Sequence, residues 1–177
     1  SDSNEQNDNE QKTIQIFSSR KVDGIILSPV GSDSTHLVNT NKNIPIVLID
    51  RNYKDLKIPF VGSNNEQGTK DATDYFIMNG HKRIAFIQGI IESSVNKDRL
   101  AGYLTSLKKN GISVDQSIIV GDNFGEENGY IETKLLLSSN KNITAIFASS
   151  NLIALGAIKA IKEEKLKIPD DISIISF

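Results

Sequence analysis

Residues 80–89 constrain the fold more than any other stretch of this chain. Gly80 predicts the end of a helix, because glycine readily adopts the left-handed conformation that closes one. The apolar run at 84–87 predicts a buried strand, and Gly89 then opens a loop. In α/β folds, small ligands bind at the carboxyl ends of the strands. The segment therefore predicts how the chain is wound and where a ligand would bind.

The same alternation continues almost to the end of the chain. Strands are expected at 22–27, 46–49, 58–61, 84–87, 118–120, 144–148 and 172–177. Helices are expected at 9–19, 34–41, 65–79, 96–110, 126–139 and 150–165. Continuous apolar runs are typical of parallel strands covered on both faces, and the alternation predicts right-handed crossovers. In the helix at 126–139, Ile131, Leu135 and Leu136 are expected to face the core.

One irregularity predicts two lobes. The strands at 46–49 and 58–61 are joined by a short polar turn with no helix between them. Pro59 marks the second of these strands as an edge strand or a crossing segment. A second sheet would then begin near Ser63, which predicts two lobes with a cleft between them.

Composition excludes several classes of function. The chain has no cysteine and two isolated histidines, so disulfides and transition-metal sites are not expected. Its net charge of −2, with both signs well mixed, argues against direct binding to nucleic acid. No apolar run approaches the ~20 residues that would cross a membrane. Neither a nucleophile elbow nor a phosphate-binding glycine loop is present, so nothing in the sequence requires an enzyme, and no cofactor is expected.

Polar residues that follow the expected strands are the candidates for ligand binding. Asp50 and Arg51 follow the second strand and form either a surface turn or a carboxylate–guanidinium pair in the cleft. Ser93 lies in the loop after Gly89 and could cap the next helix or contact a ligand. Arg99 is expected in the first turn of that helix, where the helix dipole disfavours a cation. Its position therefore favours a bond to a ligand or to a carboxylate.

Two further candidates lie in later loops. Phe124, in a polar stretch, is either a hydrophobic staple for the following helix or a ring that stacks on a ligand. Residues 149–151 are Ser-Ser-Asn and precede a helix, so a capping role and a ligand contact by Asn151 are compatible. For His81, next to the helix-ending Gly80, a structural role is expected.

Seven segments stand in a characteristic order. They are VDGIIL at 22–27, IPIVLIDR at 44–51, Val61 with Asn64, Asn65 and Gly68, GHKRIAFIQG at 80–89, RLAGY at 99–103, AIFA at 145–148 with ALGA at 154–157, and IPDDISI at 168–174. In this order they resemble the effector-binding core of the lactose-repressor (LacI/GalR) family of bacterial transcription regulators. That core is similar to periplasmic sugar-binding proteins, a two-lobed α/β fold with parallel sheets flanked by helices.

The resemblance implies the following organisation. Residues 1–62 would belong to the N-terminal lobe and 63–177 to the C-terminal lobe, each incomplete, with a sugar, sugar phosphate or purine bound between them. Arg99 matches the arginine with which the family binds effector, and Phe124 matches an aromatic residue that stacks on it. Asp50, Arg51 and Ser93 fall where other cleft residues lie. Asn151 stands where the family commonly has an aspartate, so a neutral amide replaces an acceptor of ligand hydroxyls.

The resemblance also implies a cytoplasmic homodimer that binds operator DNA through a helix-turn-helix domain outside these residues. No membrane partner is expected. An exported sugar-binding protein of a transporter remains the first alternative. A flavodoxin-like enzyme or nucleotide-binding module is the second, and the lack of a phosphate loop counts against it.

Overall fold

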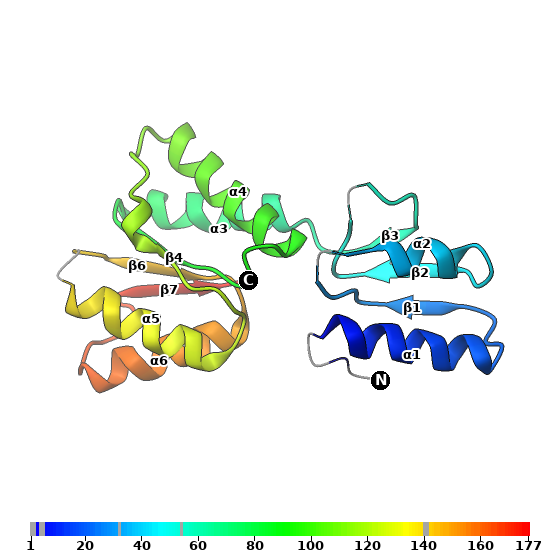
Figure 1. Cartoon of the computed structure of the whole chain (residues 1–177). Coiled ribbons are helices and arrows are strands. Elements are labelled where there is room, and N and C mark those ends of the chain that lie inside the picture. Colours follow the sequence, from blue (N-terminus) through cyan, green and yellow to red (C-terminus); the bar gives the residue numbers. More distant parts are fainter. Residues whose placement is uncertain (1–2, 4–5, 32, 54, 140–141) are drawn as a thin grey trace. The chain divides into compact units, whose positions relative to one another are not determined.

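The structure of the chain is a computed structural model that describes residues 3, 6–31, 33–53, 55–139 and 142–177 (Figure 1). It divides into two compact units. One comprises Ser1–Ser63 with Glu92–Val95, and the other Asn64–Ile91 with Asn96–Phe177. The assignment of 1–62 and 63–177 to the two lobes of a binding core stays a prediction.

The first unit is a three-stranded sheet with two helices. Its elements are α1 (Asn7–Ser19), β1 (Ile25–Leu27), α2 (Thr35–Asn41), β2 (Ile46–Ile49) and β3 (Phe60–Val61). The strands are parallel in the order β1-β2-β3, and Leu48 pairs with Phe60. Strand β3 begins directly after Pro59 and lies at the edge of the sheet. The edge-strand prediction for this segment is therefore confirmed.

Both helices of the first unit pack on the same face of its sheet. Ile14 of α1 and Leu37 of α2 form a buried cluster with Ile25, Ile46 and Leu48 from the strands. The opposite face is open among the described residues, since alternate strand residues such as Ile26 and Val61 are 74% and 66% exposed. The expectation that the strands are covered on both faces is wrong for this unit as described.

The second unit meets that expectation. Its elements are α3 (Asn65–Met78), β4 (Ile84–Ile87), α4 (Ser94–Lys109), a 3₁₀ helix (Gln116–Ile118), β5 (Ile119–Val120), α5 (Glu126–Ser138), β6 (Ala145–Ala148), α6 (Asn151–Glu163) and β7 (Ser173–Ser176). The four strands are parallel in the order β5-β4-β6-β7. Every residue of β4 and β6 is buried.

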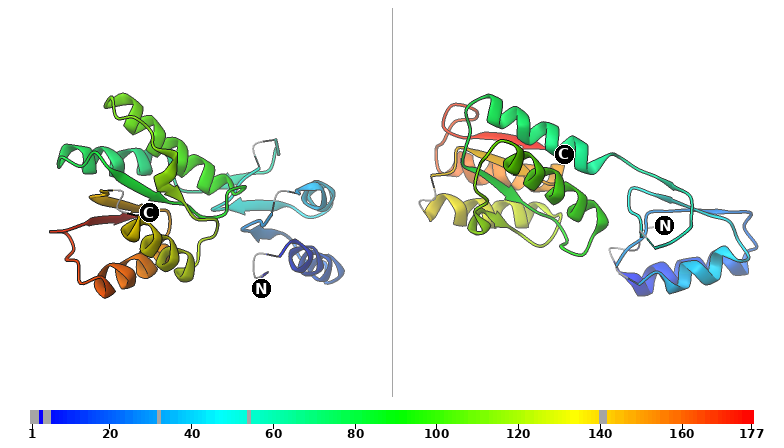
Figure 2. Two further views of the ribbon diagram at one scale, coloured as in Figure 1. Left: turned by 60° about the vertical axis from the view of Figure 1, so that its left-hand side comes forward. Right: turned by 90° about the horizontal axis from the view of Figure 1, so that it is seen from above.

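Helices cover both faces of this second sheet (Figures 1 and 2). On one face, Phe76 of α3 and Tyr103 of α4 pack against Phe86 and Phe147 of the central strands. On the other face, residues of α5 and α6 pack against the alternate residues of the same strands. The sheet is therefore the middle of three layers, and its central strands are the least exposed part of the unit.

Glycines bring α5 and α6 into close backbone contact. A Cβ atom at Gly156 would lie 1.9 Å from the carbonyl oxygen of Glu126, and one at Gly129 would lie 2.1 Å from that of Ile153. This contact fixes which face of α5 points inward. Leu136 is buried, as expected, but Ile131 and Leu135 are 45% and 57% exposed, so their predicted inward orientation is wrong.

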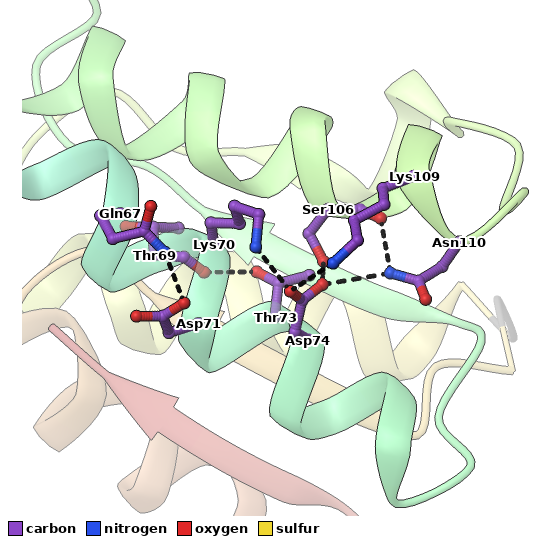
Figure 3. A network of polar contacts seen from close by, with 9 residues as sticks. All are labelled: Gln67, Thr69, Lys70, Asp71, Thr73, Asp74, Ser106, Lys109 and Asn110. Atoms are coloured by element: carbon purple, nitrogen blue, oxygen red, sulfur yellow. Dashed lines mark hydrogen bonds and ion pairs between the residues drawn. The ribbon is translucent and has the colours of Figure 1, made fainter.

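A polar network joins α3 to α4 on the other side of the sheet (Figure 3). The Asp74 carboxylate accepts hydrogen bonds from Lys70 at 2.7 Å, from the buried Ser106 hydroxyl at 2.5 Å and from Asn110 at 3.1 Å. The bonds from Lys70 and, next, from Ser106 hold the pKa of Asp74 below its usual range. Gly102 of α4 lets the two helices touch, because a Cβ there would lie 2.2 Å from the backbone of Glu66. Backbone contact and the polar network therefore hold α3 and α4 together on this face of the sheet.

Candidate functional site

Two buried asparagines hold the loops at the carboxyl edge of the second sheet. The Asn96 carboxamide oxygen accepts the Gly89 N–H at 2.8 Å, just beyond β4. The Asn128 amide donates to the carbonyl oxygen of Gln88 at 3.1 Å and to that of Asn123 at 2.6 Å. The loops after β4 and β5 are thereby held together. Asn96 lies in the first turn of α4, which begins two residues earlier, at Ser94, and its side chain closes the loop after β4 onto this helix.

That earlier start also moves Arg99 into the second turn of α4, so its predicted first-turn position is wrong. Its side chain is only 8% exposed. Its Nε–H donates to the Asn65 carboxamide oxygen at 2.9 Å, and Nη1 donates to the carbonyl oxygen of Ser149. The ring of Phe177 lies 3.9 Å from the guanidinium carbon. A cation buried this deeply needs such partners, because desolvation strongly disfavours an uncompensated charge.

Phe124 lies against the protein rather than in solvent. It is partly buried and packs on the cluster beneath α5 and α6. Its ring covers the backbone at Gly89, where a Cβ atom would come within 2.0 Å of the ring, so a side chain at this position would displace Phe124. Phe124 precedes the N-cap Gly125 of α5, yet the fourth helical residue is Gly129, which has no side chain to complete a hydrophobic staple. The staple alternative is therefore not supported by the geometry.

The third loop of this edge carries Ser150 and Asn151. Ser150 caps α6, since its hydroxyl accepts the Ile153 N–H at 3.2 Å, which confirms the capping prediction. The same hydroxyl donates to the Phe124 carbonyl oxygen at 3.1 Å and so ties this loop to the loop after β5. Asn151 is exposed at the start of α6, and its carboxamide oxygen accepts the N–H of Leu152 at 2.9 Å.

In the first unit, Asp50 and Arg51 form a sharp turn at the end of β2. Asp50 has a φ of +64°, a left-handed conformation that aspartate tolerates better than most residues. Its N–H donates to the carbonyl oxygen of Val61 at 3.0 Å, which fixes the turn to the edge strand. Its carboxylate is 56% exposed and lies 3.9 Å from Nε of Arg51, whose side chain is 16% exposed. The turn therefore presents a carboxylate at the carboxyl edge of this sheet.

Buried groups hold the neighbouring loop of the first unit, and the sequence did not reveal them. The Glu10 carboxylate is 2% exposed, accepts the Val30 N–H at 2.8 Å and lies 2.7 Å from Nε2 of His36. The Tyr53 hydroxyl donates to the carbonyl oxygens of Val30 at 2.9 Å and of Gly31 at 3.2 Å. Burial, helped by the negative charge of Glu10, raises the pKa of Tyr53 to about 12. A glutamate within an amphipathic helix gives no sign that it is buried.

The six residues predicted for the site are divided between the two units. Arg99, Phe124 and Asn151 belong to the second unit. Asp50, Arg51 and Ser93 belong to the first, because residues 92–95 group with it. Ser93 is buried, and its hydroxyl has no hydrogen-bond partner among the described residues. That all six bind one ligand stays a prediction.

The remaining titratable residues suggest no metal site. His81 bonds the Thr144 hydroxyl at 2.9 Å through Nδ1, and its ring meets the Phe76 ring edge-on. Both contacts are structural, as expected for this residue. Across the residues that the structure describes, no three His, Cys, Asp or Glu side chains come close enough to hold a metal ion. In the same part of the chain, no helix has both the length and the apolar character that a membrane span requires.

Comparison with known proteins identifies the family. Residues 2–177 match the model of the periplasmic binding proteins and sugar-binding domain of the LacI family, and the chain belongs to this family. It is 35% identical, over 98% of its length, to the HTH-type transcriptional repressor PurR of Actinobacillus pleuropneumoniae. It is 33% identical, over 97% of its length, to the repressor CytR of Escherichia coli. The resemblance of the sequence to the LacI family and the α/β fold expected from it are thus confirmed.

Solved structures agree with this assignment. The transcription regulator CcpA of Lactococcus lactis superposes with a TM-score of 0.90 at 28% identity, over 99% of this chain and 65% of that one. A sugar-binding LacI-family regulator from Escherichia coli, complexed with phosphate, gives a TM-score of 0.82 at 26% identity, over 97% of this chain and 62% of that one. The chain spans about half the length of the curated relatives that it matches: 53% of PurR and 51% of CytR.

Proposed function

We propose that this chain is the effector-binding part of a LacI-family transcriptional repressor. It would bind a small molecule, most simply a sugar, and control the binding of operator DNA by a helix-turn-helix domain outside these residues. Its membership of the family supports the proposal, as does the kinship with HTH-type repressors along nearly the whole chain.

The observation that carries the proposal is the buried guanidinium of Arg99 beside the carboxyl edge of the second sheet. Ligands of open α/β sheets bind at this edge. A guanidinium held below the surface makes charge-assisted hydrogen bonds to hydroxyl, carboxylate or phosphate oxygens, which strengthen as water is excluded. The partly buried ring of Phe124, fixed on Gly89 at the same edge, would offer an apolar face to a sugar or purine ring.

The other predicted residues would complete the recognition of the ligand. Asn151 would donate as well as accept hydrogen bonds, as an aspartate could not. Asp50, Arg51 and Ser93 would be the contribution of the first unit. Ligand binding would then favour one arrangement of the two units over another. In a homodimer that preference would change the affinity of the paired DNA-binding domains for their operator.

The alternative, an exported sugar-binding protein that serves a transporter, would use the same fold and similar ligand chemistry. The curated relatives matched along the chain are repressors, which does not favour it. The cytoplasmic location of a repressor is part of the present proposal.

A ligand screen tests the proposal. Thermal-shift assays with sugars, sugar phosphates and purines should identify an effector, and calorimetry should then give its affinity. Arg99→Ala should weaken binding by about 2 kcal/mol or more, the scale for loss of a charged hydrogen-bond partner. Arg83→Ala is the matched control, because Arg83 lies at the other end of β4 and pairs with Asp115 at 2.9 Å. Equal affinity of the Arg99→Ala protein and the unchanged protein would remove Arg99 from the site.

A further inference from the structure

Three groups from three different elements surround the Arg99 side chain. Asn65 opens α3 and accepts the Nε–H at 2.9 Å, in the plane of the guanidinium. The carbonyl oxygen of Ser149, at the end of β6, accepts from Nη1. Phe177, which follows β7, covers a face of the guanidinium at 3.9 Å. The guanidinium of Arg99 is therefore held by hydrogen bonds in its own plane and is covered on one face by an aromatic ring.

The first turn of α3 is shaped for this arrangement. Asn65 itself is only 5% exposed, so its carboxamide does not merely meet solvent. One turn later, Gly68 lies beside the Phe177 ring, and a Cβ atom there would come within 2.8 Å of Cε2 of the ring. Gly68 lies within α3 and has no positive φ, so a larger residue there would displace the Phe177 ring rather than strain the backbone. The ring could not keep its place over Arg99 next to a larger residue.

The packing beneath the turn keeps α3 and α4 in a fixed relation. Gly102 allows backbone contact at Glu66, next to Asn65, and the Asp74 network joins the same two helices further along. The distance between Asn65 and Arg99 is therefore set by helix packing and does not depend on a mobile loop. A positioned charge needs such support, since a flexible arginine loses rotamer entropy with each bond it makes.

We propose that Asn65 and Phe177 are positioning residues for Arg99. Asn65 fixes the rotation of the guanidinium through Nε, and Phe177 covers a face, so that the oxygen atoms of a ligand must approach in the guanidinium plane. This inference rests on the proposed role of Arg99 in effector binding. It adds two residues, on α3 and after β7, that themselves need not touch the effector.

Chemical labelling tests the inference without any effector. Phenylglyoxal reacts with accessible, unconstrained guanidinium groups, and peptide mass spectrometry reports the rate at each of the four arginines. The exposed Arg20 is the internal reference. Arg99 should react slowly in the unchanged chain. In Asn65→Ala its labelling should rise by about tenfold or more, the factor that corresponds to loss of a hydrogen bond to a charged group. In Asn65→Asp it should stay slow, because a carboxylate oxygen can accept the same Nε–H.

Nuclear magnetic resonance gives the second measurement. Arg99→Lys identifies the Nε–H signal of Arg99 by its disappearance. Asn65→Ala should speed the solvent exchange of that signal, and Phe177→Leu should shift it by removing the ring current. Gly68→Ala should produce the same shift as Phe177→Leu by displacing the ring. Asn79→Ala, which removes an exposed asparagine at the other end of α3, should change neither labelling nor signal.

Thermal unfolding of each variant separates positioning from simple stabilisation. A purely structural role for Asn65 would lower the melting temperature and leave Arg99 labelling unchanged well below it. That result, or equally fast labelling in Asn65→Asp and Asn65→Ala, would overturn the inference. Failure of the proposed function would show separately, as effector affinity that does not depend on Arg99.

Discussion

The carboxyl edges of the two sheets are built in different ways. In the second unit, the loops after β4, β5 and β6 are held by the buried Asn96 and Asn128 and by the partly buried Ser150. Arg99 is buried among fixed partners behind them. In the first unit, the turn at Asp50 has an exposed carboxylate, which lies 3.9 Å from Nε of Arg51. The second edge is therefore held by side chains that bond from one loop to the next, whereas the first presents an exposed charge.

Sheet coverage explains the difference. The second sheet has helices on both faces, so its loops lie above a closed core and their polar groups must be satisfied internally. The first sheet carries both helices on one face, and its edge depends on Glu10 and Tyr53. Substitutions that disturb packing should therefore lower the free energy of unfolding most in the second unit. Substitutions that remove a single buried polar group should lower it most in the first.

Gly156→Ala should have the largest effect. Its methyl group would lie 1.9 Å from the Glu126 carbonyl oxygen, between two helix backbones that cannot move aside cheaply. We expect a loss of more than about 3 kcal/mol of unfolding free energy, beyond the usual cost of overpacking. Urea unfolding followed by circular dichroism measures the loss.

Gly125→Ala is the control for that substitution. Gly125 has a φ of −79°, and a methyl group there meets only the side chain of Asn123, which can turn away. Hydrogen exchange should rise in peptides of α5 and α6 in the Gly156→Ala chain and stay unchanged in α1 and α2. If Gly156→Ala unfolds at the same urea concentration as Gly125→Ala, the close contact between α5 and α6 is not what supports the second edge.

Glu10→Ala should be the most damaging single change in the first unit. It leaves the Val30 N–H and the His36 ring without their acceptor in a buried place. The expected cost is about 2–3 kcal/mol, as for a buried hydrogen bond to a charged group. Glu10→Gln is the control, because its carboxamide oxygen can still accept from Val30. Faster exchange of the Val30 amide in the alanine variant alone would support the role. Equal exchange in both variants would show that the loop is held by other contacts.

The order of strands and helices could be predicted well from the sequence. The faces that single helices bury could be predicted less well. Apolar runs such as 84–87 and 145–148 become central strands in which every residue is buried, because removing apolar surface from water favours folding. Ile131 and Leu135 were expected inside, yet glycine-mediated contact at Gly129 turned α5 so that they face outward. Hydrophobic periodicity does not indicate a helix contact that depends on glycine, because glycine has no apolar side chain to contribute to the pattern.

The candidate site was predicted only in part, for a related reason. Arg99 and Phe124 could be proposed, because a basic residue near a helix start and an aromatic residue in a polar loop are unusual, and their part in ligand binding stays a prediction. Their supports could not be found, since Asn65 and Asn128 resemble the many asparagines at helix starts. What distinguishes these two is burial and a partner far away in the sequence: 34 residues separate Asn65 from Arg99, and 40 separate Asn128 from Gln88.

Asp74→Asn tests whether the second unit depends on charge as well as on packing. Because hydrogen bonds from Lys70 and Ser106 lower the pKa of Asp74, the folded state favours the carboxylate. Its contribution is present above the ordinary aspartate pKa of about 3.9 and is lost as the pH falls through the lowered value. We expect the variant to lose about 1–2 kcal/mol at pH 7 and to approach the unchanged chain near pH 3.

Urea unfolding across that pH range measures the effect, and Asp71→Asn is the control. Asp71 lies one turn away on α3, and its described contact is the Gln67 amide at 2.6 Å (Figure 3). It should not reproduce the pH-dependent loss. A difference between Asp74→Asn and the unchanged chain that is the same at pH 3 and pH 7 would contradict the role assigned to the carboxylate.

Tyr53→Phe should have the smallest effect and should act only on the first edge. It removes the hydroxyl that bonds the Val30 and Gly31 carbonyl oxygens, at an expected cost of about 0.5–1 kcal/mol. Burial raises the pKa of Tyr53 to about 12, so the folded state favours the neutral phenol. Its contribution is complete below the ordinary tyrosine pKa of about 10 and is lost as the pH rises towards 12. The stability of the unchanged chain should therefore fall more steeply over that interval than that of the variant.

Tyr75→Phe, at a position that is 62% exposed, is the control and should leave the slope unchanged. Parallel slopes for Tyr53→Phe and the unchanged chain would mean that the phenol does not hold this loop, and the first edge would then be looser than its hydrogen bonds suggest.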